Sequence, residues 1–157
     1  MSKVLDYLMK EDVKIVFDVD GVLAPFEFGE LKHNGCKDED WENFVIENKP
    51  YDNIRSIPQL KQFINDKGLN NVYACSVSAP YEEKNKRDFV VREYGIPVEN
   101  IKFVCDKKDK IHFLKQLAKE TKDESKVAIV EDTVSTLNQI FDTTDFITVH
   151  ISSFFFN

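Results

Sequence analysis

The sequence predicts an α/β protein built on a doubly wound, mostly parallel, Rossmann-like sheet. Short apolar runs rich in β-branched and aromatic residues recur along the chain, and amphipathic helical patterns separate them. Runs that are apolar on both faces are typical of central strands in a parallel sheet, and strand–helix alternation is typical of the doubly wound arrangement. Because the chain has 157 residues, we expect one domain over residues 1–157.

Five apolar runs mark the expected strands, at residues 13–17, 72–75, 101–105, 127–130 and 146–151. Apolar residues at helical spacing predict the main helices, over 57–64, 89–94, 111–117 and 134–141. Residues 24–52 separate the first strand from the first of these helices, and part of them, 38–48, has a helical pattern. This stretch is too short for a full lid domain, so we expect a small flap or minimal cap there.

Charge and hydropathy limit the partners of the chain. A net charge of −7 disfavours binding to nucleic acid or to an anionic membrane surface. No apolar run approaches the ~18 residues that a membrane span needs, and the N-terminal residues do not resemble a signal peptide. Three cysteines without a CxxC spacing favour free thiols in a reducing compartment. We therefore expect a cytoplasmic protein with no membrane partner.

Polar residues follow the apolar runs at the positions where ligands bind in open α/β sheets, beyond the carboxyl ends of the strands. These residues are Asp18, Asp20, Ser76, Glu131 and Asp132, and Lys110 lies near the start of a helix that follows another strand. We expect all six to meet at one edge of the sheet. Carboxylates, a hydroxyl and an ammonium group together suit phosphoryl transfer with a divalent metal.

The segment Asp18-Val19-Asp20-Gly21 follows the first strand directly. Side chains at positions i and i+2 of a strand point the same way, so Asp18 and Asp20 are expected to face one ligand. Gly21 allows an immediate turn and brings backbone N–H groups near an anion. The alternative interpretation is an Asp-Gly hairpin turn with no chemical role.

Ser76 and Lys110 have alternatives close by in the sequence. Ser78 competes with Ser76, and either serine also suits an ordinary turn after a strand. Lys107 and Lys108 compete with Lys110, and a solvated run of lysines explains all three equally well.

Two aspartates are candidate helix N-caps. Asp109 is a plausible N-cap for the helix that carries Lys110. Asp132 suits the N-cap of the helix at 134–141, with Thr133 beside it, although a cap does not explain the preceding Glu131.

The first segment resembles the first motif of the haloacid dehalogenase superfamily, a DxDG signature after an apolar strand, with Val22 where many members have Thr. The resemblance implies that Asp18 is the nucleophile and a Mg²⁺ ligand. It implies that Asp20 is first a general acid and then a base, and that its backbone carbonyl binds the metal. Ser76 matches the second motif, which binds a phosphoryl oxygen.

The remaining motifs extend this resemblance over nearly the whole chain. Lys110 matches the third motif, a lysine that stabilises negative charge on the nucleophile and the phosphoryl group. Glu131 and Asp132 match the acidic pair of the fourth motif, which implies that Asp132 completes the Mg²⁺ site and that Glu131 supports it or holds a metal-bound water.

The resemblance implies a Mg²⁺-dependent phosphohydrolase that acts on phosphate monoesters through an aspartyl-phosphate. An acid at the Asp20 position favours a phosphatase over a dehalogenase, and the short flap favours a capless or minimally capped branch. The expected substrate is a small phosphorylated molecule, as for a 5′-nucleotidase or a small-metabolite phosphatase. A non-catalytic or regulatory binding protein with the same fold is the alternative.

Other side chains carry weaker expectations. The aromatic residues of the flap either stack on a base or sugar or pack the flap onto the core: Phe26, Phe28, Trp41 and Tyr51. A basic cluster of Lys84, Lys86 and Arg87 is expected on a solvated helix face, and the alternative is that it helps to hold a phosphate-bearing tail of the substrate. The tail Phe154-Phe155-Phe156 either finishes a strand, covers the core or contacts another subunit, which makes a homo-oligomer one outcome.

Overall fold

Five strands form a single all-parallel sheet in the computed structural model, which describes residues 2–25 and 37–155. The strand order is β3-β2-β1-β4-β5. The strands are β1 (Lys14–Phe17), β2 (Val72–Val77), β3 (Ile101–Val104), β4 (Val127–Glu131) and β5 (Ile147–His150). All five predicted strands are present, and the prediction of an α/β, Rossmann-like fold is confirmed.

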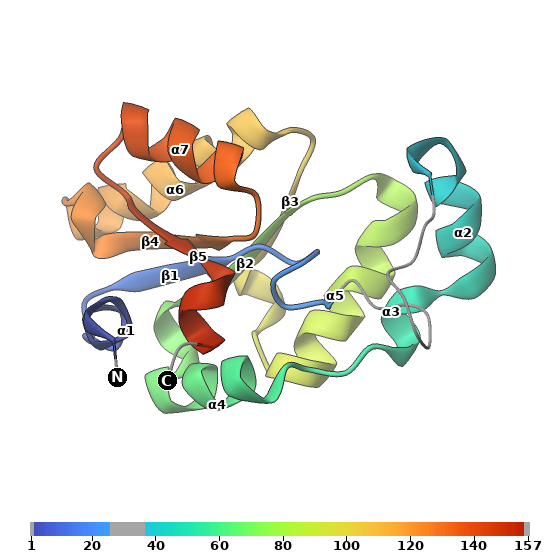
Figure 1. The fold of residues 1–157 in the computed structure, drawn as a ribbon, viewed down its shortest axis with the longest axis horizontal. Coiled ribbons are helices and arrows are strands. Elements are labelled where there is room, and N and C mark those ends of the chain that lie inside the picture. Colours follow the sequence, from blue (N-terminus) through green and yellow to red (C-terminus); the bar gives the residue numbers. More distant parts are fainter. Residues whose placement is uncertain (1, 26–36, 156–157) are drawn as a thin grey trace.

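Helices cover both faces of this sheet (Figure 1). One face carries α1 (Lys3–Leu8), α4 (Pro58–Lys67) and α5 (Pro80–Tyr94), and the other carries α6 (Lys107–Thr121) and α7 (Val134–Thr143). Short 3₁₀ turns connect the elements: η1 (Asp38–Asp40), η2 (Leu69–Asn71), η3 (Val98–Asn100), η4 (Glu124–Lys126) and η5 (Ile151–Phe155). Residues of β1 alternate between the two hydrophobic clusters, because successive side chains of a strand point to opposite faces: Ile15 and Phe17 enter one, and Val16 enters the other.

The described part of the expected flap consists of two short helices that lie beside α5 (Figure 1). They are α2 (Trp41–Asn48) and α3 (Pro50–Asn53), and Lys49 joins them in the left-handed conformation, at φ 46°. Phe26 and Phe28 lie outside the described residues. Two short helices thus make up the described part of this segment, and its role as a flap or minimal cap stays a prediction.

The C-terminal aromatic residues contribute to the core. Phe154 is buried in η5, and its ring packs against Phe63 at 5.0 Å and Phe17 at 5.9 Å between centroids. Phe155 is exposed, and Phe156 lies outside the described residues. Covering the core is thus the role of Phe154, whereas association with another subunit stays a prediction.

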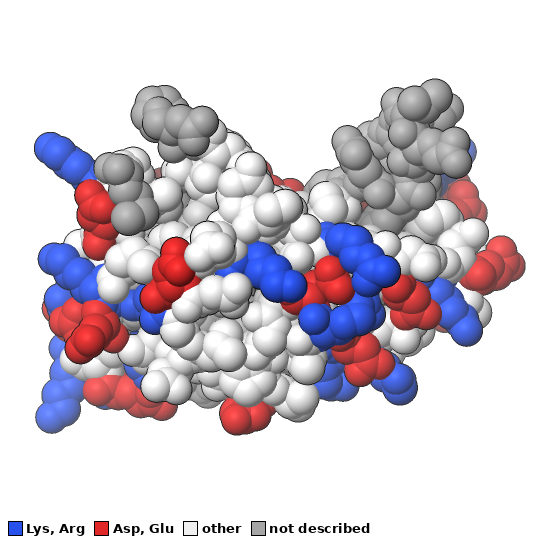
Figure 2. All heavy atoms as spheres, turned by 90° about the horizontal axis from the view of Figure 1, so that it is seen from below, with Lys and Arg blue, Asp and Glu red and all other residues white. Residues whose placement is uncertain are grey.

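Charged side chains of both signs lie close together on the face seen in Figure 2, with no large patch of one sign among the coloured atoms. None of the helices in the described part of the chain has the length and hydrophobicity to cross a lipid bilayer.

Candidate active site

The strand order reverses direction at β1. The chain runs from β1 outward through β2 to β3, and it then returns to the other side of β1 to form β4 and β5. Ligands bind in open α/β sheets at such a reversal, outside the carboxyl ends of the strands. Asp18 directly follows β1, while Glu131 ends β4 and Asp132 follows it. The acidic residues of two widely separated motifs therefore lie on neighbouring strand ends.

The turn after β1 is tight, but it is not a hairpin. Gly21 has φ 78°, and its N–H donates to the Ala24 carbonyl at 2.8 Å, while the Ala24 N–H donates to the Val19 carbonyl at 2.8 Å. In the described sheet β1 pairs in parallel with β2 and β4, so the hairpin interpretation is wrong. The buried side chain of Val19 anchors the loop between Asp18 and Asp20.

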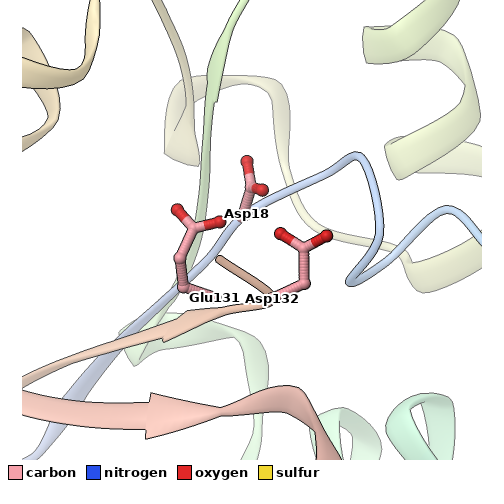
Figure 3. A group of neighbouring side chains, drawn as sticks. All are labelled: Asp18, Glu131 and Asp132. Atoms are coloured by element: carbon pink, nitrogen blue, oxygen red, sulfur yellow. The ribbon is translucent and has the colours of Figure 1, made fainter. Parts of the chain in front are cut away.

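Three carboxyl groups converge at this edge. Asp18, Glu131 and Asp132 each offer one oxygen, and these oxygens lie within 4.8 Å of one another. Figure 3 shows the three carboxyl groups on the same side of the strand ends, close to one another. Mg²⁺ prefers oxygen ligands, so the donor set fits this ion. The carboxylate of Asp20 is not part of this group.

Lys110 joins the nucleophile candidate to the acidic pair. Its Nζ lies 2.9 Å from Oδ1 of Asp18 and 2.9 Å from Oε2 of Glu131, and its side chain is buried. Burial acts to lower the pKa of Lys110, but the negative charges of Asp18 and Glu131 outweigh it and raise the pKa above its ordinary value. The ammonium is therefore charged. Lys107 and Lys108 are exposed.

The prediction of Asp109 as a helix N-cap is wrong. Helix α6 begins at Lys107, and Asp106 is its N-cap, since the Asp106 side chain accepts from the backbone N–H groups of Lys108 and Asp109. Asp106 has the extended backbone that an N-cap requires, at φ −147°. Lys110 consequently occupies the fourth helical position, from which its side chain reaches Asp18 and Glu131.

A second buried lysine lies in the same region, and its expected place on a solvated helix face is wrong. Lys86 is 1 % exposed. Its Nζ lies 2.7 Å from Oδ2 of Asp20 and 2.8 Å from Oε1 of Glu82. Burial acts to lower the pKa of Lys86, but the charges of Asp20 and Glu82 outweigh it and raise the pKa. The neighbouring Lys84 does face solvent.

Both candidate serines contact this lysine. Nζ of Lys86 donates to Oγ of Ser78 at 2.9 Å and to Oγ of Ser76 at 3.2 Å, and the two hydroxyls lie 3.3 Å apart. Ser76 belongs to β2, whose last residue, Val77, lies two positions beyond the predicted end of the strand. The structure thus brings both serines, rather than one of them, to the edge that carries Asp20.

Two aromatic residues of the flap also bind this cluster. The hydroxyl of Tyr51 donates to Oδ1 of Asp20 at 2.5 Å, and Nε1 of Trp41 donates to Oε2 of Glu82 at 2.8 Å. Tyr51 is fully buried, so packing is its role rather than stacking on a ligand. Burial, followed by the charge of Asp20, raises the pKa of Tyr51 above its ordinary value, which keeps its hydroxyl protonated as a donor.

Asp132 is held through its backbone and is not a helix cap. Thr133 occupies the N-cap position of α7 without a capping hydrogen bond from its side chain, and it instead donates to Oδ1 of Asp132 at 3.2 Å. Nε2 of His150, at the end of β5, lies 3.2 Å from the Asp132 carbonyl. The sequence analysis did not identify His150, because its proximity arises from the register that aligns it with Glu131.

The site carries an excess of negative charge. Five carboxyl groups meet two ammonium groups, a formal excess of three negative charges, in the set Asp18, Asp20, Glu82, Glu131, Asp132, Lys86 and Lys110. Burial, followed by the charge of Asp18, raises the pKa of Glu131 above its ordinary value. A divalent cation bound by Asp18 and Asp132 would reduce this repulsion, which is a second argument that the residues fit Mg²⁺.

No protein family, curated protein or solved structure matches this chain.

Proposed function

We propose that the protein is a Mg²⁺-dependent phosphohydrolase that acts on phosphate monoesters through an aspartyl-phosphate intermediate, as its resemblance to the haloacid dehalogenase superfamily implies. One observation carries the proposal. Asp18 lies at the carboxyl end of the central strand, its Oδ1 is 2.9 Å from a buried ammonium group, and it shares a potential cation site with Glu131 and Asp132. A carboxylate in such surroundings suits nucleophilic attack on phosphorus.

The proposed reaction has two steps. An Asp18 oxygen attacks phosphorus and the bond to the leaving oxygen breaks, while Asp20 gives that oxygen a proton. Asp20 then removes a proton from the water that attacks the aspartyl-phosphate, which releases phosphate and restores Asp18. Bound Mg²⁺ would offset the charge repulsion between Asp18 and the phosphoryl group.

Three further side chains support phosphoryl binding in this proposal. Lys110 stabilises negative charge on Asp18 and on the phosphoryl oxygens from its buried position. Ser76 and Ser78 offer hydroxyl groups near the carboxyl end of β2, beside Lys86. Asp132 and Asp18 would hold the ion through their carboxylates, and the resemblance adds the backbone carbonyl of Asp20 as a ligand.

Hydrolysis of p-nitrophenyl phosphate tests the proposal. We expect turnover with Mg²⁺, none in EDTA, and a loss of about 10³-fold or more in Asp18→Asn. Asp142→Asn is the matched control, because Asp142 is an exposed aspartate on α7. A panel of nucleotides and other small phosphate esters, read by phosphate release, then identifies the substrate. No turnover on any ester would contradict the proposal and favour the binding-protein alternative.

A further inference from the structure

We propose that Tyr51 and Lys86 are positioning residues that hold the Asp20 carboxyl group for proton transfer, and that they connect Asp20 to the flap helices α2 and α3. The inference rests on the proposed function, in which Asp20 protonates the leaving oxygen. It adds two residues to that step, and neither belongs to the motifs identified in the sequence.

The two oxygens of Asp20 have different partners. Tyr51 donates a hydrogen bond to Oδ1 at 2.5 Å, and the ammonium group of Lys86 forms an ion pair with Oδ2 at 2.7 Å. The two partners come from different elements, α3 and α5, so they hold the carboxyl group from two directions. A carboxyl group held in this way keeps one orientation, and proton transfer requires a fixed orientation.

Lys86 is itself fixed by its surroundings. Its ammonium group has three protons to donate, and it lies within hydrogen-bond distance of Glu82, Ser76 and Ser78 besides Asp20. A buried lysine is costly unless charged and polar partners compensate it. Lys86 therefore has little freedom to move away from Asp20 while Glu82 and the serines stay in place.

The contacts around Asp20 and Lys86 include residues of both flap helices. Tyr51 belongs to α3, and Trp41 of α2 donates to Glu82 at 2.8 Å. Arg92 of α5 in turn donates to the Tyr51 carbonyl at 2.9 Å. A displacement of α2 and α3 would therefore change the hydrogen bonds that orient Asp20. This gives the small flap a role in proton donation in addition to any contact with substrate.

Leaving-group dependence separates this role from a purely structural one. A poor leaving group such as an alkoxide needs protonation in the transition state, whereas p-nitrophenolate needs it much less. Misplacing Asp20 should therefore slow hydrolysis of an alkyl phosphate much more than hydrolysis of p-nitrophenyl phosphate. A general loss of folded protein would slow both by the same factor.

Tyr51→Phe is the first test variant, since it removes the hydroxyl and keeps the ring. We expect kcat/KM to fall about 10-fold or more for an alkyl phosphate and less than about 3-fold for p-nitrophenyl phosphate. Tyr94→Phe is the matched control, because Tyr94 is another buried tyrosine whose hydroxyl donates to the Leu23 carbonyl and not to Asp20. It should change both substrates by the same small factor.

Trp41→Phe extends the test to the flap without removing a buried charge. It removes the donor to Glu82 and keeps an aromatic ring, so we expect the same preference for the better leaving group, with a smaller change than in Tyr51→Phe. Thermal unfolding of each variant gives the folded fraction independently of activity.

The outcomes are distinct. If the wild type is active and Tyr51→Phe slows both substrates equally, the inference is wrong and the proposed function stands. If the wild type hydrolyses no ester, both are overturned. A leaving-group-dependent loss in Tyr51→Phe that Tyr94→Phe lacks is the expected result.

Discussion

Two buried lysines organise this site in different ways. Lys110 lies 2.9 Å from both Asp18 and Glu131, and Lys86 lies 2.7 Å from Asp20 and 2.8 Å from Glu82. Each ammonium group thus lies between two carboxylates, and each has a raised pKa. The partners of Lys110 lie at the carboxyl ends of two neighbouring strands, since Asp18 follows β1 and Glu131 ends β4, whereas Lys86 pairs with Glu82 of its own helix and with Asp20, two residues further along the loop after β1.

The difference indicates a division of roles. The Lys110 cluster contains the potential cation site, so under the proposed function it acts on the phosphoryl group. The Lys86 cluster contains Asp20 and contacts the flap, so under the same proposal it orients the proton donor. Substitutions in the first cluster should therefore affect all phosphate esters alike, and substitutions in the second should depend on the leaving group.

The two aspartates give the largest expected effects. Under the proposed function Lys110 and Asp18 act on the phosphoryl group, so Asp18→Asn should lower kcat by about 10³-fold or more on every ester. Asp20→Asn should lower kcat/KM by about 10²-fold on alkyl phosphates and clearly less on p-nitrophenyl phosphate, because kcat/KM reports the step in which the leaving group departs. Steady-state kinetics on both substrates checks this contrast. Equal losses of kcat/KM in Asp20→Asn on both substrates would contradict the assignment of Asp20 as the acid.

Substitution of each lysine tests the same difference between the two clusters. Lys110→Met should lower kcat by about 10²-fold with no dependence on the leaving group, because it removes charge stabilisation from the phosphoryl site. Lys86→Met should show the leaving-group dependence of Asp20→Asn, together with a lower melting temperature, because Asp20 and Glu82 lose their shared cation. Identical substrate profiles for the two variants would remove the distinction between the clusters.

Binding of Mg²⁺ should raise the thermal stability of the protein. A ligand at 100 times its Kd stabilises the folded state by about 2.7 kcal/mol, so Mg²⁺ should raise the melting temperature of the wild type. Asp132→Asn should abolish most of this increase, and Asp142→Asn, at an exposed aspartate, should preserve it. An unchanged increase in Asp132→Asn would place the ion elsewhere.

In the metal-free protein, Glu131 should give a smaller effect, a change of folding stability with pH. Its pKa is raised on folding, so the folded state binds the proton more tightly than the unfolded state does. That stabilisation is complete below the ordinary glutamate pKa and is lost as the pH rises through the raised one. From about pH 4.5 to about pH 8 the wild type should therefore lose stability relative to Glu131→Gln. Denaturant titrations of both proteins in EDTA measure this difference, and a pH-independent difference would contradict it.

The sheet and the Lys110 cluster could be predicted from the sequence because both follow from short-range rules. Apolar runs define the strands, and polar residues at their carboxyl ends meet when the sheet is parallel. Asp18, Glu131 and Asp132 come together for this reason. The start of α6 was placed too late, because the Asp106 side chain caps the helix before the apolar stripe begins.

The Lys86 cluster could not be predicted as easily, because α5 is rich in charge. A signal was nevertheless present, since Lys86 precedes Phe89 and Val90 by three and four positions and so lies on the buried stripe of the helix. The pairing with Glu82 at i,i+4 is a second sign. The contact between Tyr51 and Asp20 joins residues 31 positions apart through the path of the flap, and no local pattern encodes that path.

The most direct test of the account is to trap the covalent intermediate. The protein is mixed with Mg²⁺ and an excess of a hydrolysed ester, quenched in acid and treated with borohydride, which reduces an aspartyl-phosphate to homoserine. Peptide mass spectrometry then shows which aspartate of the site has been converted to homoserine. The account predicts homoserine at Asp18 and none at Asp20 or Asp132. An active protein with unmodified Asp18, or with the modification at another aspartate, would contradict it.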